Sequence, residues 1–240
     1  MRWIAIDGSE EKREARIVPR AARGVQITAI PLLWENGPMA GPFVISVDKV
    51  VPTLESERLR LRAYRANDAE AMFRLYSDPR VMRYWSFPPW TDLSQADAYL
   101  KRALGEMAEG RVLPWAIANR GDDRLVGTIT LFALDPVQGR AEIGYSLDPK
   151  LQGQGVASEA LRMALGHAFD ALRLRRIEAD TDPRNTPSIR LLERLGFRLE
   201  GLLRARWRVA GEICDTALYG LLAPEFVREQ RSKDASVAAP

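Results

Sequence analysis

Residues 148–160 read Asp148-Pro149-Lys150-Leu151-Gln152-Gly153-Gln154-Gly155-Val156-Ala157-Ser158-Glu159-Ala160, and they follow a predicted strand at 140–147. Two glycines stand one residue apart where this strand passes into a predicted helix at about 156–172. Because glycine has no Cβ, the backbone of such a turn can approach a ligand closely. The first amides of the helix have no partner within it, and the helix dipole adds a positive potential there. The turn therefore predicts a binding site for a phosphate or diphosphate.

Two other phosphate-binding motifs, the P-loop and the dinucleotide-binding fingerprint, also contain glycine-rich turns before a helix. A P-loop needs Gly-Lys-Ser/Thr at the start of the helix, whereas this chain has Gly155-Val156-Ala157. A dinucleotide-binding fingerprint needs a third glycine three residues after the second, and that position holds Ser158. Both interpretations fail on these residues. A tight strand–helix connection that binds no ligand stays open.

The rest of the chain alternates strands and helices. Strands are predicted at 59–62, 114–119, 125–134, 140–147 and 176–181, with two more on either side of the turn Ala210-Gly211. Besides the helix at 156–172, a helix capped by Asn67 or Asp68 is predicted to run to about Tyr76. A helix capped by Thr91 or Ser94 is predicted to run to about Glu109, and another from Thr186 or Pro187 to Leu195. Gly110 and Gly196 are expected to end the last two. This order predicts an α/β (α+β) fold with a mixed sheet and helices on both faces.

The composition is that of an ordinary globular protein with a slight positive charge. Lys and Arg number 35 against 32 Asp and Glu, and the arginines are spread along the chain, which argues against specific nucleic-acid binding. Cys214 is the only cysteine, so an internal disulfide is impossible. His167 is the only histidine, and we interpret it as structural. No apolar run approaches the roughly 20 residues that span a bilayer, and we expect a cytoplasmic protein with no membrane contact and no metal.

The pattern divides the 240 residues into three parts. Residues 52–225 carry the periodic pattern and are predicted to form one domain. Residues 1–51 have scattered glycines and prolines without a helical period, and are interpreted as an extension that is either flexible or docked as a hairpin of strands at 25–34 and 43–47. Residues 226–240 are polar and alanine-rich, which is typical of a disordered tail.

Several motifs resemble one known family. Gln152-x-x-Gly155-x-Ala157 after a strand is similar to the acetyl-CoA motif Arg/Gln-x-x-Gly-x-Gly/Ala of the GNAT superfamily of N-acetyltransferases. Asn185, Ser188 and Gly196-Phe197 match the Asn-x-x-Ser and Gly-Phe positions of its ribosomal-protein-alanine acetyltransferase (RimJ/RimL-like) branch. The segments 55–62 and 142–145 resemble the first and central strands of that branch. The resemblance covers about 52–222, and residues before Pro52 have no counterpart in it.

The resemblance implies a mostly antiparallel sheet whose central strands, at 140–147 and 176–181, splay apart around acetyl-CoA, the acyl donor. In that arrangement the main chain of the first strand pairs with pantetheine, the amides of the glycine turn hold the diphosphate, Asn185 bonds the cofactor arm, and Ser188 lies near the thioester sulfur. The implied cofactor-binding residues are Tyr145, Ser146, Leu147, Gln152, Gly153, Gln154, Gly155, Val156, Ala157, Asn185 and Ser188.

Attack of an amine on a thioester needs a neutral amine, a polarised carbonyl and a proton for the leaving thiolate. The resemblance makes Glu142 the candidate base, directly or through water, the alternative being an ordinary exposed strand glutamate. Ser188 is the candidate that protonates or orients the thiolate, the alternative being a first-turn residue that bonds backbone amides. Tyr145 is a rival acid, although an aromatic residue on a central strand is more often core. Direct attack forms no covalent enzyme intermediate, so we interpret Cys214 as a small buried strand residue.

An aromatic cluster between the first two predicted helices is the candidate acceptor site. It contains Tyr84, Trp85, Phe87 and Trp90, of which Tyr84, Trp85 and Trp90 are the candidate substrate residues; a hydrophobic plug is the alternative. The sequence thus predicts an acetyl-CoA-dependent N-acetyltransferase acting on an amine, with a protein N-terminal amine as one candidate. A small-molecule or antibiotic amine acetyltransferase and a non-catalytic CoA-binding regulator are the alternatives. Acidic residues at the acceptor cleft would favour a polycation, and an open groove a peptide. A homodimer is left open.

Overall fold

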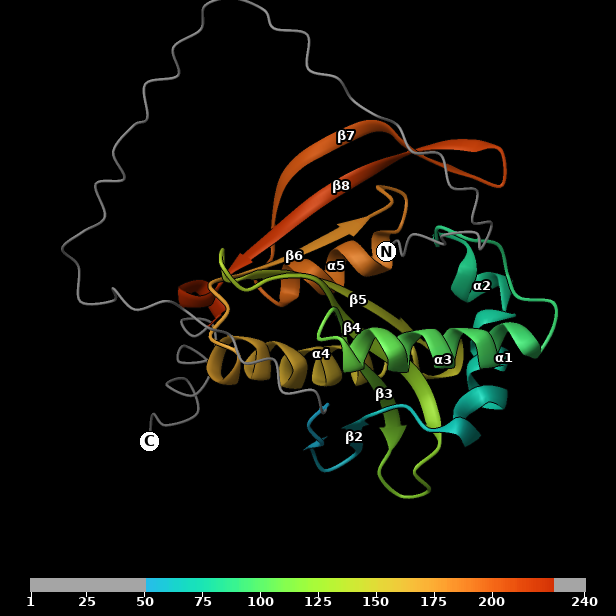
Figure 1. Cartoon of the computed structure of the whole chain (residues 1–240). Helices are drawn as coiled ribbons and strands as arrows, with labels where there is room; N and C mark the ends of the chain where they lie inside the picture. Colours follow the sequence, from blue (N-terminus) through green and yellow to red (C-terminus); the bar gives the residue numbers. More distant parts are fainter. Residues whose placement is uncertain (1–50, 227–240) are drawn as a thin grey trace, which may run out of the picture. The chain divides into compact units, whose positions relative to one another are not determined.

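The computed structural model describes residues 51–226, which contain one eight-stranded sheet with helices on both faces (Figure 1). The strands lie in the order β1-β2-β3-β4-β5-β6-β8-β7. They are β1 (Leu54–Glu55), β2 (Leu59–Arg62), β3 (Leu113–Asn119), β4 (Leu125–Asp135), β5 (Arg140–Leu147), β6 (Arg176–Thr181), β7 (Arg198–Val209) and β8 (Glu212–Leu222). The α-helices are α1 (Ala69–Tyr76), α2 (Pro79–Met82), α3 (Ser94–Ala108), α4 (Val156–Gly166) and α5 (Thr186–Arg194). Short helical turns are η1 (Ala66–Asp68), η2 (Pro149–Leu151) and the π-helical η3 (His167–Ala171).

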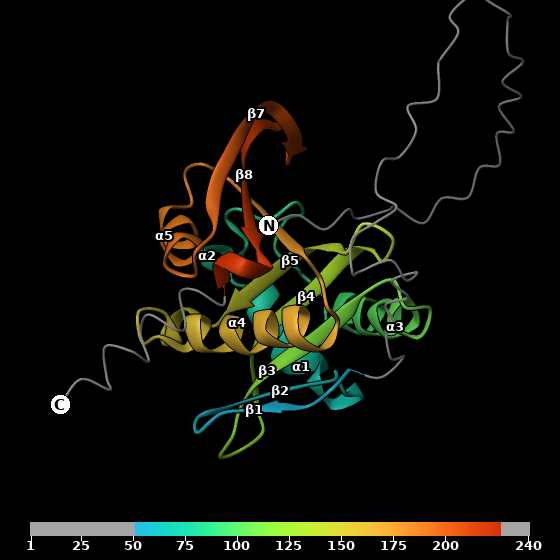
Figure 2. The same cartoon turned by 90° about the vertical axis from the view of Figure 1, so that its left-hand side faces the viewer.

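Two hydrophobic clusters attach the helices to opposite faces of the sheet. Trp115 of β3 belongs to the cluster of α4 and α5, whereas its neighbour Ala116 belongs to that of α1 and α3. Successive side chains of a strand point to opposite faces, so the two clusters lie on the two sides of β3. Figure 2 shows α4 crossing in front of the central strands. The predicted mixed sheet with helices on both faces is confirmed.

The central strands β5 and β6 are the one parallel pair among the described strands, and they pair over only three positions: Arg140↔Arg176, Ala141↔Ile177 and Glu142↔Glu178. Beyond Glu142, β5 stays paired with β4 as far as Leu147, and β6 stays paired with β8 as far as Thr181. The two strands therefore diverge toward their carboxyl ends, as Figure 1 shows. The expected splay of the central strands is confirmed.

The predicted helix caps needed correction. Neither Thr91 nor Ser94 caps α3; the Asp92 carboxylate accepts a hydrogen bond from the Ser94 amide at 2.8 Å, and the Gln95 side chain accepts from Thr91 and Asp92. Asp68 precedes α1, but its carboxylate bonds the Arg65 amide and the Arg62 guanidinium instead of amides of α1. The helix predicted at about 156–172 is α4 followed by η3. The predicted extension (1–51) and tail (226–240) lie outside the described residues, apart from Val51 and Phe226.

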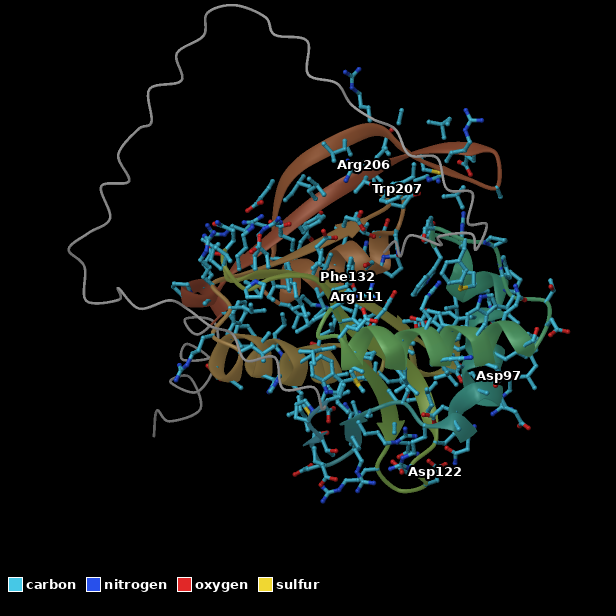
Figure 3. The ribbon with its side chains drawn as sticks, in the orientation of Figure 1. Asp97, Arg111, Asp122, Phe132, Arg206 and Trp207 are labelled. Atoms are coloured by element: carbon cyan, nitrogen blue, oxygen red, sulfur yellow. The ribbon has the colours of Figure 1, made fainter. Side chains whose placement is uncertain are left out.

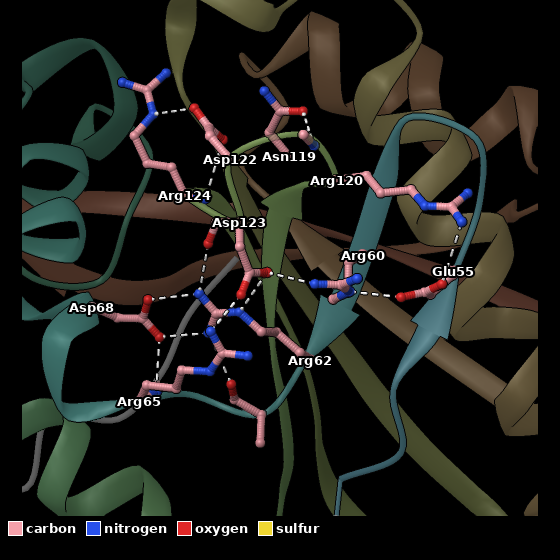
Figure 4. Close-up of polar contacts among 12 residues, drawn as sticks. Glu55, Arg60, Arg62, Arg65, Asp68, Asn119, Arg120, Asp122, Asp123 and Arg124 are labelled. Atoms are coloured by element: carbon pink, nitrogen blue, oxygen red, sulfur yellow. Dashed lines mark hydrogen bonds and ion pairs between the residues drawn. The ribbon is translucent and has the colours of Figure 1, made fainter.

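A buried ion pair fixes β2 to the start of α1 (Figure 4). Arg62 bonds Asp68 through two parallel contacts of 2.8 Å, and both side chains are at most 5% exposed. Arg62 also donates to the Asp123 carbonyl at 3.0 Å and to its carboxylate at 3.2 Å. Asp123 lies in the β3–β4 turn with a left-handed φ of 55°, and Arg60 and Arg65 bond the same carboxylate. These contacts hold the turn, β2 and α1 together.

Replacing Arg62 with methionine should destabilise the fold strongly. The Asp68 carboxylate would stay buried without its cation, and breaking a buried pair in this way costs about 3–5 kcal/mol. Arg74→Met is the matched control, because its pair with Glu70 is 63% and 76% exposed, and such pairs contribute about 0–1 kcal/mol. Urea unfolding measures both. Equal losses of less than about 1 kcal/mol would show that the Arg62–Asp68 pair does not hold β2 to α1.

Candidate functional site

The glycine turn after β5 is open and has a backbone that favours glycine. Gly153 and Gly155 have φ angles of 75° and 78°, in the left-handed region that other residues enter at a cost. A Cβ on Gly153 would meet no described atom within 4 Å, and one on Gly155 would meet only Arg58, at 3.8 Å from Nη2. Residues 152–155 are exposed. The surface of the turn is therefore free to receive a ligand that a side chain would displace.

Helix α4 begins directly at this turn with Gly155 as its N-cap residue, and no side chain among residues 51–226 caps it. The first helical bond runs from the Glu159 amide to the Gly155 carbonyl at 3.0 Å, so the amides of Val156, Ala157 and Ser158 precede it. Two bonds shape the turn: Gln154 Nε2 donates to the Lys150 carbonyl at 2.7 Å, and the Asp148 carboxylate accepts from the Lys150 amide at 2.9 Å. An open glycine cradle at the start of a helix, whose first amides have no partner within the helix, fits a diphosphate.

At the end of β5, only alternate peptide groups face the side on which the cofactor arm is expected. The Asp148 amide donates to the Val126 carbonyl of β4 at 2.8 Å, so the peptide groups of Asp148 and Ser146 face β4. Since these groups alternate along a strand, those of Tyr145 and Leu147 face the β6 side, beyond the end of the β5–β6 pairing. The Ser146 hydroxyl is buried and lies 2.7 Å from Thr128 Oγ1, which lies 2.8 Å from the Tyr76 hydroxyl. Ser146 thus belongs to a structural chain of hydroxyls.

Helix α5 brings Ser188 against β5. The Tyr145 hydroxyl and Ser188 Oγ lie 2.7 Å apart, so the two candidate acids are hydrogen-bonded to each other. Burial raises the pKa of Tyr145 more than the Ser188 bond lowers it, and the phenol keeps its proton at neutral pH. Asn185 Oδ1 accepts from the Ser188 amide at 3.3 Å, so Asn185 caps α5, and its Nδ2 group is the part that could bond a cofactor.

Glu142 lies at the last paired position of β5 and β6, opposite Glu178. Its side chain is half-buried, which does not fit the alternative of an ordinary exposed glutamate. Burial raises the pKa of Glu142, and the charges of Asp180 and Glu178 raise it further, against the opposing charges of Arg140 and Arg206. Strand periodicity places Glu142 and Tyr145 on opposite faces of β5. The site therefore has a carboxyl group on one face and a hydroxyl pair on the other, at the point where the strands diverge.

A bulge in β7 carries Arg206, which the sequence did not single out. Leu203 pairs with Thr216 and Trp207 with Cys214, so Arg204, Ala205 and Arg206 stand opposite Asp215 alone. Ala205 has a left-handed φ of 52°, and its amide donates to the Asp215 carboxylate at 2.8 Å. Figure 3 shows Arg206 and Trp207 on this strand. Bulges re-aim side chains, and this one brings a positive charge into the electrostatic range of Glu142.

The aromatic candidates for the acceptor site differ in burial. Trp85 and Trp90 are 6% and 8% exposed and contact the Tyr76 ring, at centroid distances of 5.1 and 4.8 Å. They form a hydrophobic plug on the α1–α3 face, so contact with a substrate would require this plug to open. Tyr84 is half-buried, with the Arg83 guanidinium 5.2 Å from its ring centroid. Their role toward a substrate stays a prediction.

The two remaining single-residue interpretations concern Cys214 and His167. Cys214 is buried on β8, as predicted. The His167 ring lies edge-to-face against Trp115 at 5.9 Å, which fits a structural residue. Across residues 51–226, no group of three or more His, Cys, Asp or Glu side chains is arranged to hold a metal ion. No described helix has both the length and the apolar character needed to cross a membrane.

A mixed sheet with diverging central strands, and an open glycine turn at the start of the helix that follows, is the arrangement that the resemblance to N-acetyltransferases implied. The family model "Acetyltransferase (GNAT) domain" matches residues 58–198. "Uncharacterized N-acetyltransferase p20" of Bacillus licheniformis is 39% identical over 174 residues, which cover 72% of this chain and 98% of that protein. Spermidine N(1)-acetyltransferase of Escherichia coli is 22% identical over 76% of this chain and 95% of its own length. The structure of Mycobacterium smegmatis RimJ in complex with CoA-disulfide matches at TM-score 0.66 and 29% identity, covering 73% of this chain and 89% of that one.

The chain belongs to the GNAT family of acetyltransferases, in its RimJ/RimL-type branch. It is an N-acetyltransferase that uses acetyl-CoA and an amine substrate. The expected enzyme class is confirmed.

Gly155→Asp should abolish most acetyl-CoA binding and leave the fold intact. The new carboxylate would occupy the cradle and repel the diphosphate, and each charge-assisted contact it disturbs contributes about 1.5–3 kcal/mol. Gly121→Asp is the control, because a Cβ there meets only Asn119 Oδ1, at 3.8 Å, in the β3–β4 turn. Calorimetric titration gives the affinity and circular dichroism the fold. Unchanged affinity in a folded Gly155→Asp variant would place the diphosphate elsewhere.

Proposed function

We propose that this enzyme acetylates a primary amine by direct attack, with Glu142 as the base and the Ser188–Tyr145 pair as the proton donor to the leaving sulfur. The observation that carries the proposal is the half-buried Glu142 at the point where β5 and β6 diverge, with the hydroxyl pair on the opposite face. A base and an acid on the two sides of one opening can serve an amine and a thioester that meet within it.

The proposed roles follow from the protonation states. Acetyl-CoA supplies a thioester whose carbonyl carbon accepts the amine. Glu142 takes the proton that the amine nitrogen loses as the new N–C bond forms, and its raised pKa brings it closer to that of an amine than an exposed carboxylate would be. Burial keeps the Tyr145 phenol protonated before the reaction. As the S–C bond breaks, Ser188 Oγ gives its proton to the sulfur and takes the proton of the Tyr145 hydroxyl in its place. Cys214 is buried and takes no part.

The charges near Glu142 favour an acceptor with a single amine, such as a protein N-terminus. Three carboxylates lie there, on Glu142, Glu178 and Asp180, but Arg140, Arg176 and Arg206 oppose them. A balanced set gives a polycation little electrostatic advantage. Membership of the RimJ/RimL-type branch also supports a protein N-terminal amine as the acceptor.

A polyamine is the second candidate acceptor. The observation that favours it is the clustering of the same three carboxylates, since Arg206 is exposed on its bulge and could move aside to uncover them. One of the similar proteins is a spermidine N(1)-acetyltransferase, which supports testing this class of acceptor.

The acceptor is tested by measuring CoA release with a thiol reagent over a panel of amines. The panel contains peptides with free N-termini, the same peptides with blocked N-termini, spermidine, an aminoglycoside and free amino acids. Turnover of the free but not the blocked peptides would support the N-terminal assignment. Preference for spermidine would support the second candidate. Tight CoA binding with no turnover of any amine would identify a regulator and overturn the proposal.

Glu142→Gln should lower kcat/KM by roughly 100-fold to 10,000-fold, the usual contribution of a general base, with acetyl-CoA affinity nearly unchanged. In the unmodified enzyme kcat/KM should rise with pH through the raised pKa of Glu142, because only the carboxylate is a base. The variant should lack that acidic limb. Glu70→Gln, at an exposed position of α1, is the control. Full activity of Glu142→Gln at every pH would transfer the role of base to another group.

The same substitution should not lower stability at neutral pH. A folded-state pKa above the unfolded one means that Glu142 contributes stability only while it is protonated, and that this contribution is lost as the pH rises through the folded pKa. At pH 7 the carboxylate therefore opposes folding. We expect a melting temperature for Glu142→Gln at or above that of the unmodified enzyme, measured by thermal unfolding. A clearly lower value would show that Glu142 has a structural role.

A further inference from the structure

Arg58, which lies in the turn between β1 and β2, brings a positive charge to the glycine turn. Its Nη2 atom is 3.8 Å from the position that a Cβ on Gly155 would take, and its Nη1 donates to the Gln154 carbonyl at 3.4 Å. The side chain is 54% exposed. Nearly a hundred residues separate Arg58 from Gln154 along the chain, so only the tertiary fold brings them together. The guanidinium lies beside the same backbone that forms the anion cradle.

Glu159 and Ser56 hold this guanidinium in place. Arg58 Nε donates to Glu159 Oε2 at 2.9 Å, and Nη2 bonds the same oxygen. Ser56 Oγ donates to Glu159 Oε1 at 2.6 Å. Burial alone would raise the pKa of Glu159, but the bonds from Ser56 and Arg58 and the charge of Arg58 outweigh it, and the net pKa is lowered. The carboxylate is therefore charged. Both oxygens of the carboxylate are thus occupied, and the planar guanidinium is fixed at its Nε edge.

Arg58 also compensates for an unfavourable charge at the start of α4. A glutamate in the first turn suits the helix dipole but would repel an anion bound there. Arg58 neutralises that charge. A guanidinium has five N–H donors, and the Glu159 bonds use those of the Nε edge. Among residues 51–226, the Nη1 group contacts only the Gln154 carbonyl, at the long distance of 3.4 Å, so it can turn toward a phosphate oxygen beside Gly155.

We propose that Arg58 is a cofactor-binding residue that contacts the diphosphate of CoA at the glycine turn, with Glu159 and Ser56 as the residues that position it. The site then combines the amides of α4 with one side-chain cation, a donor that matches phosphate geometry well. The proposal rests on the use of acetyl-CoA and adds a residue that lies outside the glycine turn.

Calorimetric titration of the full chain with CoA tests the proposal without turnover. Arg58→Ala should weaken CoA binding about 10-fold to 100-fold, the range for a lost charge-assisted hydrogen bond. The affinity of the variant should also depend less steeply on salt, because one ionic contact is missing. Arg74→Ala, which removes an exposed arginine of α1, is the control and should bind as the unmodified chain does.

A second variant and a second ligand complete the experiment. Arg58→Gln keeps a donor toward Glu159 and removes the charge, so it should show the same loss and serves in place of Arg58→Ala if that variant melts at a much lower temperature. Titration with 3′-dephospho-CoA should preserve the difference between the variants, because the diphosphate remains. If the difference disappears, Arg58 reads the 3′-phosphate and the assignment is wrong.

The outcomes separate this inference from the cofactor site itself. If the unmodified chain binds CoA and both Arg58 variants bind within twofold of it, the role of Arg58 is refuted and the glycine cradle stands. If the unmodified chain fails to bind CoA, the cofactor site and the role of Arg58 are both refuted.

Discussion

The pairing between β5 and β6 stops after Glu142↔Glu178, and the arrangement of the site depends on where it stops. A parallel pair that continued would place the peptide groups of Tyr145 and Leu147 inside the sheet. The divergence has a local cause in the neighbouring strands: β4 holds β5 along its length, and β8 holds β6 as far as Thr181. The glycine turn then starts α4 just past the end of the diverging strand. Strand pairing therefore sets where Glu142 and the main-chain groups of β5 leave the β5–β6 pair, and the turn amides follow directly after them.

The sequence predicted those parts of the fold that depend on local chemistry. The bounds of β5 and β6 are as predicted, and the two glycines lie in the turn between β5 and α4, where the structure adds that both have a left-handed φ. Contacts between distant residues could not be derived in this way. The Arg58–Glu159 and Tyr145–Ser188 contacts join elements far apart in the chain, and the β7 bulge that presents Arg206 depends on the register with β8. Two helix caps were also wrong: at α3 the Asp92 carboxylate, and not Thr91 or Ser94, accepts a backbone amide, and Asp68 bonds Arg65 and Arg62 instead of amides of α1.

Charge is used in two different ways in this protein. Arg62 and Asp68 are buried as a satisfied pair, and their geometry ties one turn and two elements into a single arrangement. Glu142, Glu178 and Asp180 instead place like charges close together, and burial first, then the charges of Asp180 and Glu178, raise the pKa of Glu142. Clusters of this second kind are frequent at reactive sites, where stability is lost in exchange for an adjusted protonation state. The arginines on Glu178 limit that loss without removing it.

The strand order β6-β8-β7 has a consequence for how the chain folds while it is synthesised on the ribosome. β8 is the last of the described strands to be synthesised, yet it lies between β6 and β7. Until it emerges, β6 pairs among the described strands only with β5, at three positions, and β7 has no described strand beside it. The nascent chain thus carries two unsatisfied strand edges beside a nearly finished core, a state that invites association with other chains. The sheet is therefore completed late, when β8 inserts between β6 and β7. Only then is β6, the strand that diverges from β5, held along its length.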